Sequence, residues 1–116
     1  MAKSKLLIPK RGEVWWVNFD PSVGGEIKKK RPAIIISNDM ANENMNRVQA
    51  VPLTSNTNKL YPVECVVTIK GKQSKALGDQ ITTISKMRLV SKLGKITSED
   101  MASVERVLCL QLGIKR

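Results

Sequence analysis

The sequence predicts a mainly β fold, in which a small, curled antiparallel sheet is closed by one helix at the C-terminus. Short runs of β-branched and apolar residues recur along the chain and are separated by clusters of Gly, Pro, Asn and Lys. Helical spacing of apolar residues is clear only near the C-terminus. The 116 residues, of which 41% are hydrophobic and 26% charged, suit one buried core, so we expect a single domain over residues 1–116.

The first third of the chain predicts two strands joined by a loop. The first strand is expected at Glu13–Phe19, where Trp15 and Val17 share one face of an alternating segment. The segment Asp20–Lys30 contains a proline, two glycines and a lysine run, which indicates a mobile loop of the kind that often carries functional sites. The continuous apolar run Pro32–Ser37 is typical of a strand buried on both faces.

The middle of the chain predicts further strands, to about six in total. They are expected at Arg47–Thr54, Pro62–Lys70, Lys75–Ile84 and Leu89–Ile96. Because proline has no N–H to donate, Pro52 would have to lie at an edge, a bulge or a strand end. A turn at Gly71–Ser74 would lead into the segment that begins at Lys75.

One good helix is expected, and it comes last. Thr97 can cap it, acidic residues occupy the first turn and Gly113 follows the end. Four apolar residues would line one face at helical spacing: Met101, Val104, Leu108 and Leu112. A curled antiparallel sheet closed by one or two short helices follows from this order, and an SH3-like small barrel is the obvious case.

The charge balance points to a polyanionic partner. Twenty Lys and Arg residues against ten Asp and Glu residues leave a formal net charge of +10, which favours a nucleic acid, an acidic protein or an anionic membrane. A membrane is the weakest of the three, because no apolar run approaches the ~20 residues of a spanning helix. Leu6–Ile8 is also too short for the apolar part of a signal sequence. We therefore expect a cytoplasmic protein.

Several site chemistries are excluded by composition. The chain has no histidine, which rules out a Ser-His-Asp or Cys-His site, an imidazole metal cluster and RNA cleavage by a pair of histidines. Cys65 and Cys109 lie far apart in separate apolar segments, so neither a redox pair nor a zinc spacing exists, and both are interpreted as core residues. We expect no metal and no cofactor.

Three segments carry a recognisable pattern in consistent order and spacing. They are RGEVWWVNFDPSVGGEIKKKRPAIIISND (Arg11–Asp39), VPLT (Val51–Thr54) and ALGDQITTIS (Ala76–Ser85). Together they resemble the MazF/PemK-like toxins. In that family an Arg-Gly-acidic strand and a Phe-Asp-Pro turn lead through a glycine-containing loop to an Arg-Pro that opens a hydrophobic strand. The resemblance spans nearly the whole chain.

The resemblance implies both a fold and an activity. The fold would be an SH3-like barrel of the CcdB/PemK type with a C-terminal helix, assembled as a homodimer. The activity would be a metal-independent endoribonuclease that cuts single-stranded RNA, with mRNA as the expected target, at short sequence motifs and so inhibits translation and growth. A cognate acidic antitoxin would neutralise the protein by placing its tail in the RNA groove.

The resemblance also assigns catalytic residues by position. The family's arginine falls on Arg31, its threonine on Thr54 and its loop glutamate on Glu26. The loop here has Gly-Gly-Glu where Gly-Ser-Glu is common, and a lysine within Lys28–Lys30 replaces the glycine usual before the Arg-Pro. These departures bear on loop conformation and sequence preference more than on chemistry.

Each assigned residue suits one part of the reaction, in which the 2′-hydroxyl of RNA attacks the adjacent phosphorus. Arg31 can neutralise the growing phosphoryl charge with a planar fork, although a surface ion pair is the structural alternative. Its position before a proline favours extended geometry. Thr54 could bind a phosphate or orient the attacking group, or could merely cap a strand end. Glu26 could accept the 2′-proton or orient Arg31.

RNA would be held by basic and polar residues around this site. Three consecutive lysines, Lys28, Lys29 and Lys30, would bind the backbone, although a solvated charge run is compatible with the same pattern. Gln80 could read a base edge, and Asn56 lies in the polar loop after Thr54. Trp15 and Trp16 face opposite sides of their strand, so at most one could stack a base, and core or dimer packing is the alternative for both.

Two other classes of function remain open from the sequence alone. One is a non-catalytic toxin of similar fold that binds a protein target such as DNA gyrase. The other is a plain nucleic-acid-binding SH3-like barrel, which would share the positive charge but leave RNA intact.

Overall fold

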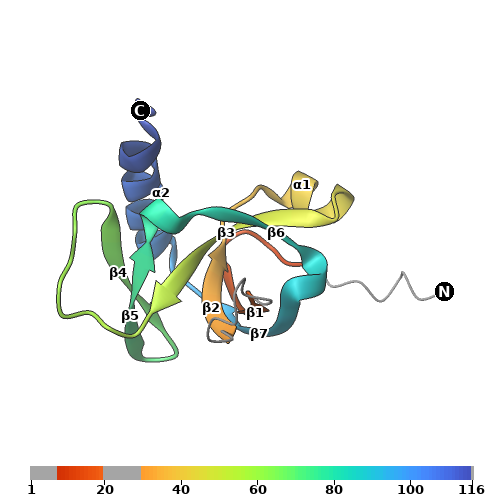
Figure 1. Ribbon diagram of the computed structural model, residues 1–116, viewed down its shortest axis with the longest axis horizontal. Coiled ribbons are helices and arrows are strands. Elements are labelled where there is room, and N and C mark those ends of the chain that lie inside the picture. The colour runs from red at the N-terminus through yellow and green to blue at the C-terminus, as the bar shows by residue number, and fades with distance from the viewer. Residues whose placement is uncertain (1–7, 20–29, 116) are drawn as a thin grey trace, which may run out of the picture.

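The computed structural model describes residues 8–19 and 30–115, which form a seven-stranded antiparallel sheet and a C-terminal helix (Figure 1). The strands are β1 (Glu13–Asn18), β2 (Lys30–Ile35), β3 (Arg47–Thr54), β4 (Glu64–Ile69), β5 (Lys72–Leu77), β6 (Thr82–Ser85) and β7 (Leu89–Lys95). The helices are α1 (Asp39–Asn44) and α2 (Ser98–Leu112), with short 3₁₀ turns η3 (Gly78–Gln80) and η4 (Lys86–Arg88). The predicted mainly β class with a C-terminal helix is confirmed.

Strand β3 is the hub of the sheet. The strand order is β4-β5-β3-β2-β1-β7, and β6 also pairs with β3. Along one edge β3 pairs with β2, and along the other its first half pairs with β6 and its end, Leu53 and Thr54, pairs with β5. Figure 1 shows β3 running between these partners as the sheet curls. Pro52 lies between the residues of β3 that pair with β6 and those that pair with β5. Its missing N–H therefore interrupts the hydrogen bonds to neither strand.

The central strands are buried on both faces, as the run of apolar residues at β2 predicted. One face packs under α2, in what we call the helix core, which includes Val14, Ile34, Val51, Leu53, Val67, Val104 and Leu108. The opposite face forms the strand core: Trp15, Val17, Ala33, Ile35, Val48, Ala50, Ile84 and Leu89. Ile34 and Ala33 are both fully buried although they point to opposite faces.

The hairpin between β4 and β5 turns earlier than expected. The prediction of a turn at Gly71–Ser74 was wrong, since β5 already begins at Lys72. The two residues of the turn are Lys70 and Gly71, with φ of +51° and +79°. Positive φ at both central positions gives the backbone twist that suits a two-residue hairpin. The sequence hid this turn because a lysine rarely adopts positive φ.

The segment Lys75–Ile84 is two strands rather than one. It is divided by η3, whose first residue, Gly78, donates its N–H to the Val63 carbonyl at 3.1 Å. A Cβ placed on Gly78 would lie 2.5 Å from that carbonyl oxygen and 3.3 Å from Cγ2 of Val107. The missing side chain therefore allows the loop before β4 to cross against the sheet and under α2.

Helix α1 was not predicted. Asn38 caps it by accepting the N–H of Ala41 at 2.8 Å. Asn42 is fully buried and donates to the Ser37 carbonyl at 2.9 Å. The sequence of α1, DMANEN, has no apolar residues at helical spacing from which a helix could be predicted.

Helix α2 begins and ends as expected. The Thr97 hydroxyl accepts the N–H of Asp100 at 3.0 Å, and Gly113 closes the helix with φ of +70°. The expected apolar face is correct except at its end, since Leu112 is 51% exposed and Val107 is buried instead. Among the residues that the structure describes, no helix is long and apolar enough to span a membrane.

We predict that Gly78→Ala lowers the free energy of unfolding by about 1–3 kcal/mol, because the new methyl group must displace backbone. Urea titration of the purified protein measures this. Gly94→Ala is the control, since its Cβ would meet Cγ2 of Ile69 at an ordinary 3.5 Å. Equal stabilities for the two variants would contradict the close approach at Gly78.

Candidate functional site

Arg31 and Thr54 lie at the ends of neighbouring strands. Arg31 is the second residue of β2 and pairs with Val17, and Thr54 is the last residue of β3. The register of β2 on β3 pairs Ala33 with Pro52, so its continuation by two residues places Arg31 opposite Thr54. Two residues singled out separately in the sequence thus come together at one end of the sheet.

Both side chains belong to the strand-core face. Arg31 follows the same alternation as Ala33, and Thr54 the same alternation as Ala50. Both residues are half-buried. Arg31 forms no hydrogen bond or ion pair with another described residue, so the surface ion pair considered as its structural explanation is not found in the described part of the chain.

The loop after Thr54 is folded back on its own polar side chains. The Thr54 hydroxyl accepts the N–H of Asn56 at 3.3 Å, and the side-chain Oδ1 of Asn56 accepts the N–H of Asn58 at 3.2 Å. These are local turns of the kind that Thr and Asn side chains favour. The Thr54 hydroxyl keeps its proton for donation, so the capping interpretation and the functional one are compatible.

A buried ion pair that was not predicted from the sequence lies directly beside Thr54. Lys75 pairs with Thr54 across β5 and β3 and is only 8% exposed. Its Nζ lies 3.0 Å from Oε1 of Glu64 and donates to the Lys59 carbonyl at 2.7 Å. The same Nζ lies 5.8 Å from the centroid of the Tyr61 ring. We call this group, Lys75 with Glu64, Lys59 and Tyr61, the Lys75 clamp.

The clamp fixes the loop that follows Thr54. Glu64 forms the ion pair with Lys75 and also accepts the Tyr61 N–H at 2.9 Å. The N–H of Tyr61, and then Lys75, lower the pKa of Glu64 from its ordinary value against the opposing effect of desolvation. The signal in the sequence was a lysine at the start of the otherwise apolar KAL, which could have been interpreted as a buried cation in need of a partner.

The remaining predicted RNA contacts are not all on this face. Lys30 is exposed and precedes Arg31, so it points to the opposite face, where it lines a pocket of about 460 Å³ with Trp16. Gln80 is exposed on η3. It lies just before β6, whose residue Thr82 pairs with Ala50. Three further predicted residues, Glu26, Lys28 and Lys29, lie outside the described residues.

One tryptophan is buried and the other is partly exposed, as expected. Trp15 is 6% exposed, lies in the strand core and donates to Oε1 of Glu13 at 3.0 Å. Trp16 is partly exposed, so it alone of the pair can contact a ligand. Cys65 is buried as predicted, whereas Cys109 is only half-buried on α2.

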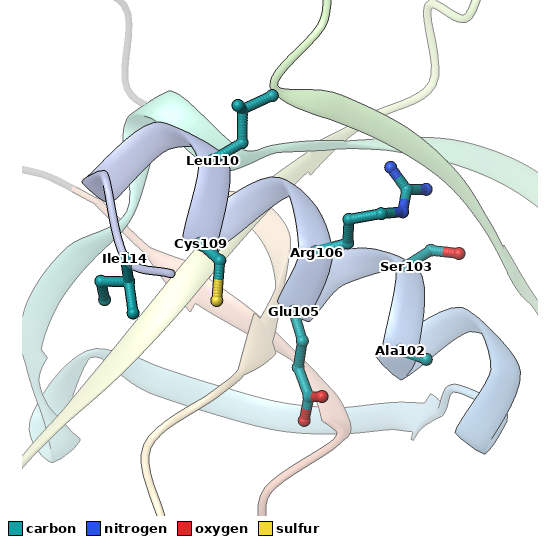
Figure 2. A pocket seen from close by; sticks show the side chains of 7 residues that line it. All are labelled: Ala102, Ser103, Glu105, Arg106, Cys109, Leu110 and Ile114. Carbon is teal, nitrogen blue, oxygen red and sulfur yellow. The ribbon is translucent and has the colours of Figure 1, made fainter. Parts of the chain in front are cut away.

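A larger pocket lies along α2, away from Arg31 and Thr54 (Figure 2). Its volume is about 760 Å³, and it is lined by Ala102, Ser103, Glu105, Arg106, Cys109, Leu110 and Ile114. Glu105 and Arg106 leave the helix in different directions. Glu105 is paired with Arg11 at 2.9 Å.

We predict that Glu64→Gln reduces the loss of stability on acidification. Because the folded-state pKa of Glu64 is lowered, its carboxylate stabilises the fold above the unfolded value of 4.5, and this contribution is lost as pH falls through the folded-state pKa. Urea titrations at pH 7 and pH 3 should give a smaller difference in unfolding free energy for Glu64→Gln than for the parent.

The matched control for Glu64→Gln is Glu43→Gln, which removes a carboxylate from the exposed surface of α1 and leaves the clamp intact. This control should lose stability on acidification as the parent does. A parent-like loss in Glu64→Gln would refute the assigned role of the clamp.

Comparisons of this chain with a family model and with known proteins all indicate the same family. Residues 10–112 match the family model described as "PemK-like, MazF-like toxin of type II toxin-antitoxin system". Endoribonuclease MazF9 of Mycobacterium tuberculosis is 36% identical over 114 residues, covering 90% of this chain and 97% of the relative. Endoribonuclease toxin MazF of Escherichia coli is 31% identical over 107 residues, covering 91% and 96%.

A solved structure agrees with these relatives. It is an endoribonuclease in complex with its cognate antitoxin from Mycobacterial species. The TM-score is 0.77 at 27% identity, and the alignment covers 93% of this chain and 98% of that one.

Proposed function

The chain belongs to the PemK-like, MazF-like toxin family, and from that premise we propose that it is a sequence-specific endoribonuclease toxin acting on single-stranded RNA. The observation that supports this most directly is the register of β2 on β3, which brings Arg31 and the Thr54 hydroxyl to one end of the sheet. Arg31 has no ion-pair partner among the described residues. The relatives that are 36% and 31% identical bear the name endoribonuclease, and each is covered almost completely.

The proposed reaction uses the substrate's own nucleophile. The 2′-hydroxyl attacks the adjacent phosphorus, the bond to the 5′-oxygen of the next nucleotide breaks, and the products carry a 2′,3′-cyclic phosphate and a 5′-hydroxyl. An enzyme accelerates this step by aligning the attack and by stabilising charge on the phosphoryl oxygens. No metal is required for this scheme.

Arg31 and Thr54 have different roles in the proposed reaction. Arg31 offers two parallel N–H donors to the phosphoryl oxygens and keeps its charge at every relevant pH. Pro32 follows it and favours the extended backbone of β2. Thr54 donates its hydroxyl proton to a phosphoryl oxygen or to the attacking group. Glu26 stays a candidate proton acceptor or a partner that orients Arg31.

The proposed partners follow from charge and from the family. A net charge of +10 attracts the RNA backbone and equally an acidic antitoxin. The similar mycobacterial endoribonuclease is bound to its cognate antitoxin. We propose that this chain also has such a partner, acts as a homodimer, and cuts mRNA in the cytoplasm, which inhibits translation and growth.

We predict that Arg31→Ala lowers the cleavage rate of a long single-stranded RNA by roughly 100-fold or more, the effect of removing one preorganised charge-stabilising donor. Arg31→Lys should recover little, because a point charge does not reproduce the fork. The matched control is Arg47→Ala, which removes the same charge from the other end of β3. A folded Arg31→Ala variant that cuts at near-parental rate would falsify the assignment.

A second prediction concerns the substrate. Replacing the 2′-hydroxyl at the mapped cut site with hydrogen should abolish cleavage there, since the nucleophile is gone. Cleavage of the all-RNA control should be equally fast in EDTA, and mass spectrometry should find a 2′,3′-cyclic phosphate on the upstream product. Cleavage of the deoxy-substituted RNA would contradict the mechanism, and intact RNA throughout would favour a binding protein.

A further inference from the structure

Tyr61 is an aromatic ring that is held in place yet open to solvent. It is the single tyrosine of the chain and is 54% exposed. Its backbone N–H is bound by Glu64 at 2.9 Å, and the ammonium of Lys75 lies 5.8 Å from the ring centroid. The neighbouring Leu60 is also exposed, at 55%. Because the backbone of Tyr61 is fixed and its ring contacts a cation, stacking of a planar group costs less conformational entropy than on an unrestrained ring.

A pocket beside this ring contains an arginine side chain, Arg106. Its volume is about 500 Å³, and it is bounded by Leu60, Tyr61 and Pro62 from the loop and by Ser103 and Arg106 from α2. Arg106 forms no ion pair or hydrogen bond with another described residue. The acidic side chain at this pocket, Glu64, is already neutralised by Lys75. The pocket therefore offers an aromatic ring and a cation that has no ion-pair partner among the described residues.

The Lys75 clamp connects this pocket to the candidate catalytic end of the sheet. Lys75 is the cross-strand neighbour of Thr54, and its ammonium also contacts the Tyr61 ring. Thr54 and Tyr61 are thus separated by a single lysine side chain. An RNA strand with its phosphate at Arg31 and Thr54 would pass Tyr61 with a flanking nucleotide.

We propose that Tyr61 and Arg106 form a flanking-nucleotide subsite, in which a base of the RNA stacks on Tyr61 and Arg106 binds the phosphate beside it. This rests on the proposed endoribonuclease function and adds a contact outside the catalytic pair. Aromatic rings and cations together are the usual means by which proteins bind single-stranded nucleic acid. Lys75 is a positioning residue in this subsite, because it holds the ring rather than the substrate.

Steady-state cleavage tests the subsite with a short RNA built around a cut site mapped with the parent enzyme. Tyr61→Ala should raise KM by about 5- to 150-fold, the range for losing one base stack, and should change kcat by less than about threefold. Tyr61→Phe should match the parent, because the ring is kept. Arg106→Gln should raise KM and weaken its dependence on salt. Met87→Ala, which alters an 84% exposed side chain on η4, is the control.

Abasic substitution locates the stacked base. Single abasic residues placed in turn along the RNA should raise KM for the parent at one flanking position. The same substitution should add little in Tyr61→Ala, because the stack is already lost. Abasic effects of equal size in both enzymes would overturn the subsite, as would a parental KM in Tyr61→Ala.

Two further outcomes are distinguishable. If Tyr61→Ala weakens binding of an acidic antitoxin peptide but leaves KM for RNA unchanged, the surface serves a protein partner and the nucleotide subsite is wrong. If the parent leaves RNA intact, the proposed function fails and the subsite fails with it.

Discussion

The pairing of β3 along both of its edges is the constraint on which the structure depends. β2 occupies one edge, and β6 and β5 share the other. Because side chains alternate strictly along a strand, a shift of β2 on β3 by one residue would leave Arg31 and Thr54 on opposite faces of the sheet. The apolar residues of both cores would be misplaced at the same time, so the packing that stabilises the fold also fixes the geometry of the candidate site.

The Lys75–Glu64 pair adds order more than stability. Moving two charges out of water costs several kcal/mol per ion, and their attraction regains this only when the geometry is good. Here the remaining donors and acceptors are used: Lys75 also binds the Lys59 carbonyl, and Glu64 also binds the Tyr61 N–H. The pair thereby ties the loop after Thr54 to the edge of the sheet. A hydrophobic pair of the same volume would lack these directional contacts.

Much of the fold follows from the sequence, because burial and capping leave local patterns. The apolar run at β2 and the Thr97 cap of α2 are examples, and both are confirmed. The turn at Lys70 was not predicted because a lysine rarely adopts positive φ. The break at Gly78 was not predicted because it depends on how the distant Val63 carbonyl packs against this glycine. Arg31 and Thr54 were found through family resemblance, but their juxtaposition is a property of strand register. The Lys75 clamp was not predicted because the sequence around Lys75 does not indicate which residue pairs with it.

Burial of β2 and β3 on both faces has a consequence for how this chain can diverge. A substitution within these strands disturbs one of two packed cores, so Arg31 and Thr54 are carried on the part of the molecule least tolerant of change. The loop that carries Tyr61 and the outer surface of α2 touch these cores much less. Homologous chains can therefore acquire different sequence preferences by altering that loop and helix, while the strands that carry the proposed catalytic residues stay as they are.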